Sequence, residues 1–263
     1  MGSRTATLLQ PVQKSLGSSI PGALALLFVI TSFLSAFLLF QVQLIVSKHI
    51  LPWFGGTAAV WTTCMLVFQL LLLAGYVYSH LISAKLSPAA QTRLHLGLLA
   101  VALLVVLVLS ILWPSAVTPG RNWKLEGGSP VLRVALLIML ATGLPFFVLS
   151  TTGPLLQSWY ARLGGGTRAY KLYAISNLGS FLGLLTFPFL LEPTFRLRTL
   201  GLTWSVLFAG FIAVCGLGAW NARNASHEAS LPAEGKLVVS HGTGAVAVVS
   251  ACSLRIFLTP RHY

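Results

Sequence analysis

Five polar side chains lie within or beside strongly apolar segments, where they could do chemistry. They are Gln41, Gln43, Gln69, Asn177 and Glu192. An amide without a hydrogen-bond partner is costly in hydrocarbon, so each must be paired or hydrated. Two interpretations of the four amides stay open: they donate hydrogen bonds between neighbouring helices, or some of them line a polar cavity, as in a transporter.

Glu192 is the acidic residue closest to any of these apolar segments. It lies at the end of one, in the sequence PFLLEP. One interpretation is an interfacial carboxylate in an ion pair with Arg196 or Arg198. The other is a contact for a cation or a polyamine at the mouth of a pathway. Both interpretations remain open at this point.

The residue types needed for most catalysis and metal binding are scarce. The chain has four acidic residues, all glutamates, and no aspartate. No GxxxxGK[ST] loop is present to bind nucleotide phosphates, and the six histidines are dispersed without zinc-ligand spacing. We therefore expect no catalytic residues, no metal and no cofactor.

One segment has the small residues that allow helices to approach closely. Gly179 and Gly183 form a GxxxG pattern, and Ser176 and Ser180 lie beside it. In membranes such small residues mark helix contacts. We expect this segment to pack tightly against another helix.

The elements that must position these residues are apolar helices. The chain is 56% hydrophobic and 8% charged, whereas soluble domains are about 25% charged. An apolar run of about 20 residues can span a bilayer, and its backbone must bond internally, which favours helices. The sequence thus predicts an all-α, polytopic helical bundle with about six transmembrane helices. The predicted spans are 24–46, 58–82, 94–113, 131–152, 173–191 and 200–220.

The formal charge of +13 is interpreted as a topology signal. The basic residues are scattered between apolar runs with no basic stripe, so nucleic acid is not an expected partner. If the chain crosses the membrane six times, eleven Lys and Arg residues lie on the same side of the membrane as the N-terminus, and six lie on the opposite side. The six are Lys48, Arg121, Lys124, Arg133, Arg196 and Arg198. This bias predicts cytoplasmic N- and C-termini.

The sequence changes character after the last predicted span. Residues 1–220 are expected to form the transmembrane domain, and residues 221–263 a polar linker and a mildly apolar tail. On its length alone this tail could form a seventh span, although His241 and three serines lie within it.

Three sequence motifs of the chain resemble those of a known family of membrane proteins. They are LPWFGGTAAVWTTCMLVFQLLLLAGYVYSHL (51–81), LSTTGPLLQSWYARLG (149–164) and YAISNLGSFLGLLTFPFLLEP (173–193). The segment 24–220 resembles the membrane half of the bacterial fused major-facilitator/spermidine synthase-like proteins. The resemblance implies a multi-helix membrane module of a bacterial inner (plasma) membrane, which in the family precedes a cytosolic aminopropyltransferase domain. It also implies further spans after the linker, so we expect the tail of this chain to be the product of a truncation or a frameshift.

The chain departs from this family in three places. Gly153 stands where Ala is usual, and RAYKLY (168–173) replaces a run containing Asp-Pro-Tyr, which introduces Lys171. The synthase domain of the family is also missing, because that domain needs aspartates and this chain contains none. The chain is therefore not expected to be an enzyme.

Three hypotheses about function remain. The chain could transport or channel a polyamine or a related small cation, although a chain with so few acids is poorly suited to cations. It could be a non-catalytic membrane anchor or interaction module for a separately encoded aminopropyltransferase. It could also be a non-functional remnant.

Overall fold

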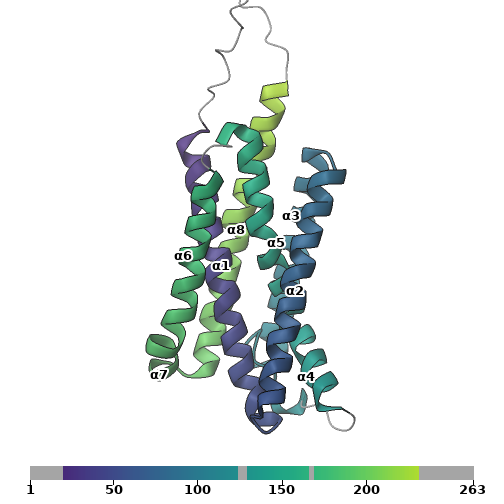
Figure 1. The fold of residues 1–263 in the computed structure, drawn as a ribbon, viewed down its shortest axis with the longest axis vertical. Coiled ribbons are helices and arrows are strands. Elements are labelled where there is room, and N and C mark those ends of the chain that lie inside the picture. The colour runs from purple at the N-terminus through teal and green to yellow at the C-terminus, as the bar shows by residue number, and fades with distance from the viewer. Residues whose placement is uncertain (1–19, 124–128, 166–168, 231–263) are drawn as a thin grey trace, which may run out of the picture. The chain divides into compact units, whose positions relative to one another are not determined.

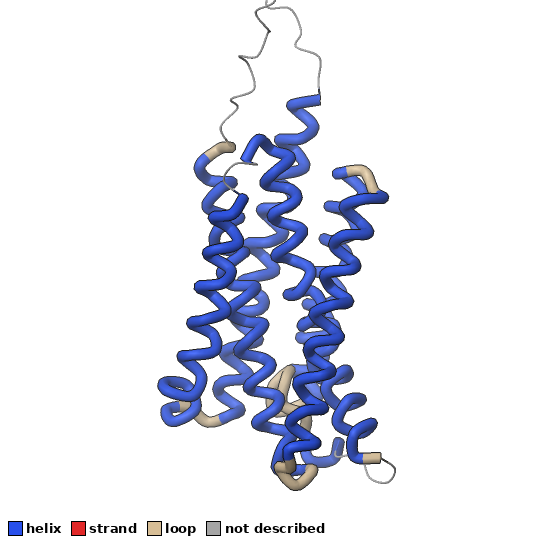
Figure 2. The backbone as a smooth tube through the Cα atoms, viewed as in Figure 1, coloured by secondary structure: helices blue, strands red, loops and turns tan. Residues whose placement is uncertain are grey.

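The computed structural model describes residues 20–123, 129–165 and 169–230, and in these ranges the chain is helical with no β-strand (Figures 1 and 2). The helices are α1 (Gly22–Ile50), η1 (Leu51–Trp53), α2 (Ala58–Lys85), α3 (Pro88–Leu112), η2 (Arg121–Trp123), α4 (Pro130–Ile138), η3 (Met139–Gly143), α5 (Leu144–Tyr160), η4 (Ala161–Gly165), α6 (Ala169–Thr186), η6 (Phe187–Leu191), α7 (Glu192–Thr194) and α8 (Leu197–Ser230).

Six helical segments in the described ranges are long and apolar enough to cross a membrane, which confirms the predicted all-α bundle. They are Gly22–Trp53, Ala58–Lys85, Pro88–Leu112, Pro130–Gly164, Ala169–Thr194 and Leu197–Asn224. Successive long segments alternate in direction, as the colour gradient of Figure 1 shows. Each observed segment extends beyond its predicted core, because polar and aromatic end residues continue the helix into the interface.

The last helix runs beyond the predicted span 200–220 and into the segment predicted as a linker. Helix α8 continues to Ser230. The sequence NARNASHEAS contains no glycine or proline to end a helix, and Pro232 is the first helix-breaking residue after it. The expectation of a truncated or frameshifted tail falls on residues 231–263, which lie outside the described residues.

Proline coincides with widened helical turns in two spans. The π-helical turn η3 precedes Pro145 in the fourth span, and the π-helical turn η6 contains Pro188 in the fifth. Proline has no amide N–H and its ring collides with the carbonyl one turn earlier, so the helix widens locally. Both spans nevertheless continue as helices across the interruption (Figure 2).

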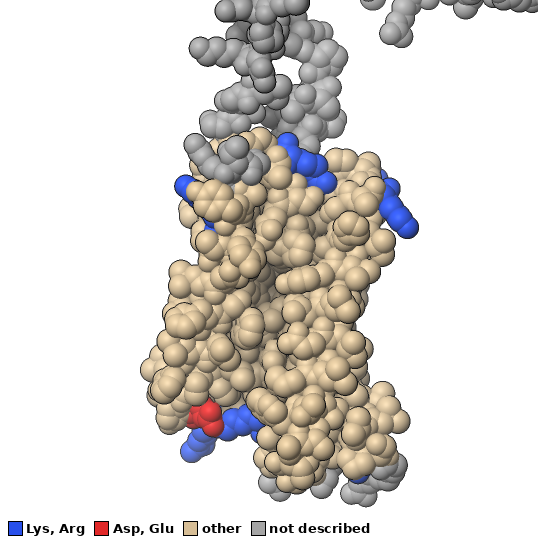
Figure 3. All heavy atoms as spheres, in the orientation of Figure 1, with Lys and Arg blue, Asp and Glu red and all other residues tan. Residues whose placement is uncertain are grey.

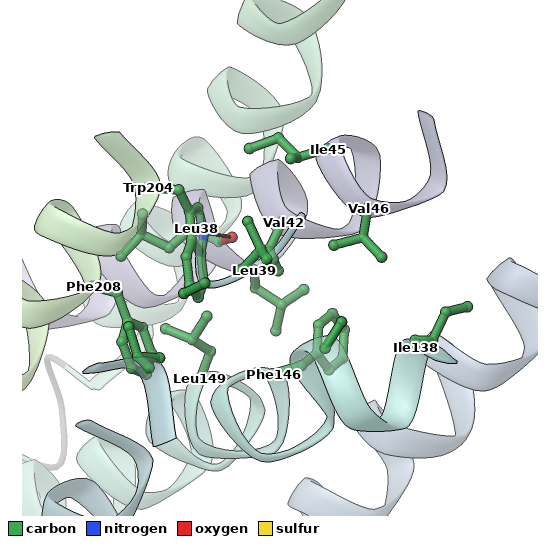
Figure 4. Packing of buried hydrophobic residues seen from close by; sticks show 14 of the residues in the cluster. Leu38, Leu39, Val42, Ile45, Val46, Ile138, Phe146, Leu149, Trp204 and Phe208 are labelled. Atoms are coloured by element: carbon green, nitrogen blue, oxygen red, sulfur yellow. Dashed lines mark hydrogen bonds between the residues drawn. The ribbon is translucent and has the colours of Figure 1, made fainter. Parts of the chain in front are cut away.

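Helix α1 lies at the centre of the bundle and contacts α5, α6 and α8, while α2 packs on α4 and α5. The core between these helices is filled by large apolar side chains (Figure 4). Trp204 of α8 stacks on Phe208 with 5.0 Å between ring centroids, and its Nε1 donates a hydrogen bond to the Leu38 carbonyl at 2.9 Å. This packing fixes α8 against α1.

The outer surface of the described helices is apolar. Ile111, Val206 and Phe189 are 83%, 72% and 77% exposed. The middle of the face in Figure 3 carries no charged side chain, and the basic and acidic residues gather at its two ends. A surface of this kind is stable in lipid and not in water. The chain is therefore a multi-pass membrane protein.

Candidate functional site

Gln41 joins α1 to α6 through two hydrogen bonds. Its Nε2 donates to the carbonyl oxygen of Gly183 at 2.9 Å and to Oγ1 of Thr186 at 3.0 Å. The Thr186 hydroxyl itself donates to the Leu182 carbonyl, so it can only accept from Gln41. The orientation of the Gln41 amide is thereby determined. Its Nε2 serves helix association.

The GxxxG segment lies where α6 meets α1. A β-carbon at Gly179 would stand 2.6 Å from the Phe33 carbonyl oxygen, and one at Gly183 would stand 2.9 Å from that of Phe37. Only glycine permits this approach of the two backbones. Ser176 and Ser180 are partly buried beside the contact.

A small cavity adjoins the other side of the Gln41 amide. It has a volume of about 110 Å³ and is lined by Gln41, Thr203 and Trp204 together with apolar residues. The Gln41 Oε1 is buried and has no hydrogen-bond partner among the described residues.

The other three amides do not meet Gln41. Nε2 of Gln43 lies 3.2 Å from Sδ of Met65 on α2. Gln69 of α2 and Asn177 of α6 are exposed on the outer surface and make no hydrogen bond to another described residue. Gln69 and Asn177 therefore face the lipid or another molecule in it.

Glu192 pairs with Lys48, near the end of α1. Lys48 Nζ and Glu192 Oε1 are 2.5 Å apart, and their side chains are 42% and 41% exposed. The interpretation in which Glu192 forms an ion pair with Arg196 or Arg198 is wrong. Arg198 Nε instead donates a hydrogen bond to the Pro114 carbonyl at 3.3 Å. The close packing of α6 on α1 brings the two chain-distant residues to the same level.

A groove opens beside this ion pair. It has a volume of about 470 Å³ and runs between the end of α1, the start of α2 and the segment α6–η6. Its walls are apolar side chains such as Leu44, Trp61 and Leu184, and its charged residues are Lys48 and Glu192. Of the five predicted polar residues, the structure therefore brings Glu192 to this groove and Gln41 to the small cavity, and Gln43, Gln69 and Asn177 to neither.

A polar cluster that the sequence analysis did not single out lies near the start of α3. Oε1 of Gln91 accepts hydrogen bonds from Trp159 Nε1 at 3.0 Å and from Arg162 at 2.7 Å, and its Nε2 donates to the Leu86 carbonyl at 2.8 Å. Gln91 and Trp159 are buried. A glutamine in the first turn of a helix that begins with Pro88 was the available signal, but it looked like an ordinary helix end.

A second missed contact joins α2 to α5. Ser79 Oγ donates to the Thr151 carbonyl at 2.8 Å, and Ser150 lies so close to Gly75 that a β-carbon at position 75 would collide with it. The run Ser150, Thr151 and Thr152 is fully buried. Three consecutive hydroxyl residues in an apolar span were the signal for a helix contact.

These arrangements define a polytopic α-helical membrane protein whose interior is held by apolar packing and by polar contacts between helices. Among the described residues, no group of three or more His, Cys, Asp or Glu side chains could hold a metal ion. Compared with protein-family models, curated proteins and solved structures, the chain matches none.

Proposed function

We propose that the chain is a non-catalytic membrane module that anchors a partner protein at the membrane. The observation that carries this proposal is the dispersal of its polar side chains. Gln41 and Gln91 join helices, whereas Gln69 and Asn177 face outward. A transport pathway needs polar groups that converge on one cavity.

The groove argues against polyamine transport. Its walls are apolar, and its one carboxylate, Glu192, is paired with Lys48. A polyamine carries several positive charges, so it would be repelled by Lys48 and would gain no further acid in the groove. Transport of a small cation is therefore the weaker candidate.

The partner in this proposal is a separately encoded aminopropyltransferase on the cytoplasmic side of a bacterial inner membrane. Two things support this choice: the resemblance of three sequence motifs to spermidine synthase-like fusions, and the basic end of the bundle. Lys85, Arg93, Lys171 and Arg223 lie at the end where α1 begins. This end can attract an acidic protein surface.

The test is co-purification of the full-length chain with the aminopropyltransferase of the same organism. We expect capture of the enzyme by the tagged wild-type chain, and a loss of at least tenfold for the double variant Arg93→Glu, Lys171→Glu. The matched control is Arg196→Glu, Arg198→Glu at the opposite end, which should retain capture. Equal capture by both variants, or no capture by the wild type, would overturn the proposal.

A second measurement addresses transport directly. Proteoliposomes with the full-length chain should take up no more labelled spermidine than empty vesicles. Uptake that disappears in Glu192→Gln would establish transport in place of anchoring.

A further inference from the structure

The groove beside the Lys48–Glu192 pair is about as long as one leaflet of a bilayer is thick. Its lining extends from Glu192 back along α6–η6 to Phe181. These residues are separated by 11 positions, or roughly 16 Å at 1.5 Å per helical residue. The hydrocarbon core of a bilayer is about 30 Å thick, so the groove matches the depth of one leaflet. Its volume of about 470 Å³ falls in the ordinary range of ligand pockets.

The π-helical turn η6 shapes one wall of the groove. Phe187 in this turn is 4% exposed and packs into the core, whereas Phe189 is 77% exposed. Pro188 between them supplies no amide N–H, so the regular helical bonding is interrupted here. Because Phe181 and Leu184 are also exposed, the groove opens sideways toward lipid.

The ion pair stands at the level of lipid head groups. Lys48 and Glu192 lie near the ends of the spans Gly22–Trp53 and Ala169–Thr194. In Figure 3 the red acidic patch adjoins blue basic side chains at the lower end of the bundle. Both side chains are about two-fifths exposed, so each can exchange its partner for an external group.

We propose that this groove binds a phospholipid whose head group carries a primary amine, with phosphatidylethanolamine as the type. One acyl chain occupies the apolar groove. The phosphate meets Lys48 Nζ, and the ammonium group donates hydrogen bonds to the Glu192 carboxylate. The ion pair between Lys48 and Glu192 is thereby replaced by two ion pairs with the zwitterionic head group, one from Lys48 to the phosphate and one from Glu192 to the ammonium group. This inference is independent of the proposed anchoring role.

The chemistry of the pair separates this lipid from others. The quaternary ammonium of phosphatidylcholine has no N–H to donate to Glu192. Phosphatidylglycerol offers a phosphate for Lys48, but its glycerol hydroxyls carry no positive charge to balance the Glu192 carboxylate. A hydrogen bond to a charged group contributes about 1.5–3 kcal/mol, which corresponds to a preference of about tenfold or more.

The experiment measures lipids retained by the delipidated, full-length chain. Phosphatidylethanolamine, phosphatidylcholine and phosphatidylglycerol with identical acyl chains compete in detergent micelles, and bound lipid is counted by native mass spectrometry. We expect about tenfold more bound phosphatidylethanolamine than either competitor. Equal retention of the three lipids would overturn the proposal, and so would a preference for phosphatidylglycerol.

Two variants separate the head group from the chain. Glu192→Gln should reduce the preference for phosphatidylethanolamine over phosphatidylcholine to about one, because a neutral amide no longer attracts the ammonium group. Leu184→Trp should fill the groove and reduce binding of every lipid. The matched control Leu104→Trp changes an equally lipid-exposed leucine on α3 and should bind as the wild type does.

Each variant can contradict the proposal on its own. A Glu192→Gln chain that keeps the preference would exclude the head-group contact. A Leu184→Trp chain that binds lipid as Leu104→Trp does would exclude the groove. The Lys48–Glu192 pair is exposed, and exposed ion pairs contribute little to stability, so Glu192→Gln should fold even if Leu184→Trp does not. A dimer in the same spectra that added lipid does not dissociate would assign the groove to a second copy of the chain.

Discussion

A β-carbon at Gly179 of α6 would stand 2.6 Å from the carbonyl oxygen of Phe33 on α1. The neighbouring atom belongs to the backbone of the central helix, so it cannot rotate away as a side chain could. The α1–α6 contact therefore depends on the absence of a side chain at this position.

Gly179→Ala should lower the free energy of unfolding by about 1–3 kcal/mol, because the added methyl group forces the two helices apart. Unfolding by sodium dodecyl sulfate in mixed micelles measures this. The matched control is Gly210→Ala in α8, where a β-carbon meets no atom within 4 Å. This control should be neutral or stabilising by up to about 1 kcal/mol. Equal effects of the two substitutions would contradict the contact.

Gln41→Leu should cost about 0.6–1.7 kcal/mol, the range measured for hydrogen bonds between membrane helices. The substitution removes the bonds to Gly183 and Thr186. Gln69→Leu is the control, since that side chain is exposed and bonds to no described residue. Its replacement should leave stability in mixed micelles unchanged or raise it. A loss as large as that of Gln41→Leu would show that Gln69 has a partner in the membrane.

Gln91→Leu should destabilise the chain by about 1–3 kcal/mol, because the buried Trp159 Nε1 would lose its acceptor. The double variant Gln91→Leu, Trp159→Phe removes donor and acceptor together. Its loss should be smaller than the sum of the two single losses. Strict additivity in a double-mutant cycle would contradict a direct interaction between the two side chains.

The proposed orientation places Lys171 in the cytoplasm and Arg196 on the outer side. In a background without the three native cysteines, Arg196→Cys should react with a membrane-impermeant maleimide in intact cells, and Lys171→Cys should react only after lysis. Among the described residues each end of the bundle carries five Lys and Arg residues, because five of the eleven on the side of the N-terminus lie in the segments 1–19 and 231–263. The reverse labelling pattern would invert the topology.

The six spans could be predicted because each is an uninterrupted apolar run, and the length needed to cross a bilayer is a physical constant of the membrane. The place of the GxxxG segment in a helix contact could also be anticipated, since only small residues permit such proximity. The end of α8 was misjudged, because the polar residues after 220 suit a helix in water as well as a linker.

The roles of individual polar residues could not be predicted in the same way. Gln41 and Gln69 are the same residue type in similar apolar surroundings, yet one lies between helices and the other faces outward. In a soluble helix an apolar stripe marks the inner face, whereas a membrane helix is apolar on all sides. Glu192 was assigned to nearby arginines because its partner Lys48 is 144 positions earlier in the chain.

The bond between Gln41 and Gly183 also has a consequence for synthesis. The two residues are 142 positions apart. At 5–20 residues per second, a ribosome needs roughly 7–28 seconds to add the intervening chain. During that interval α1 is in the membrane and α6 does not yet exist, so the Gln41 amide and the bare backbone opposite Gly179 face lipid or the insertion machinery. Helix α1 thus waits in the membrane for the neighbour that completes its contacts.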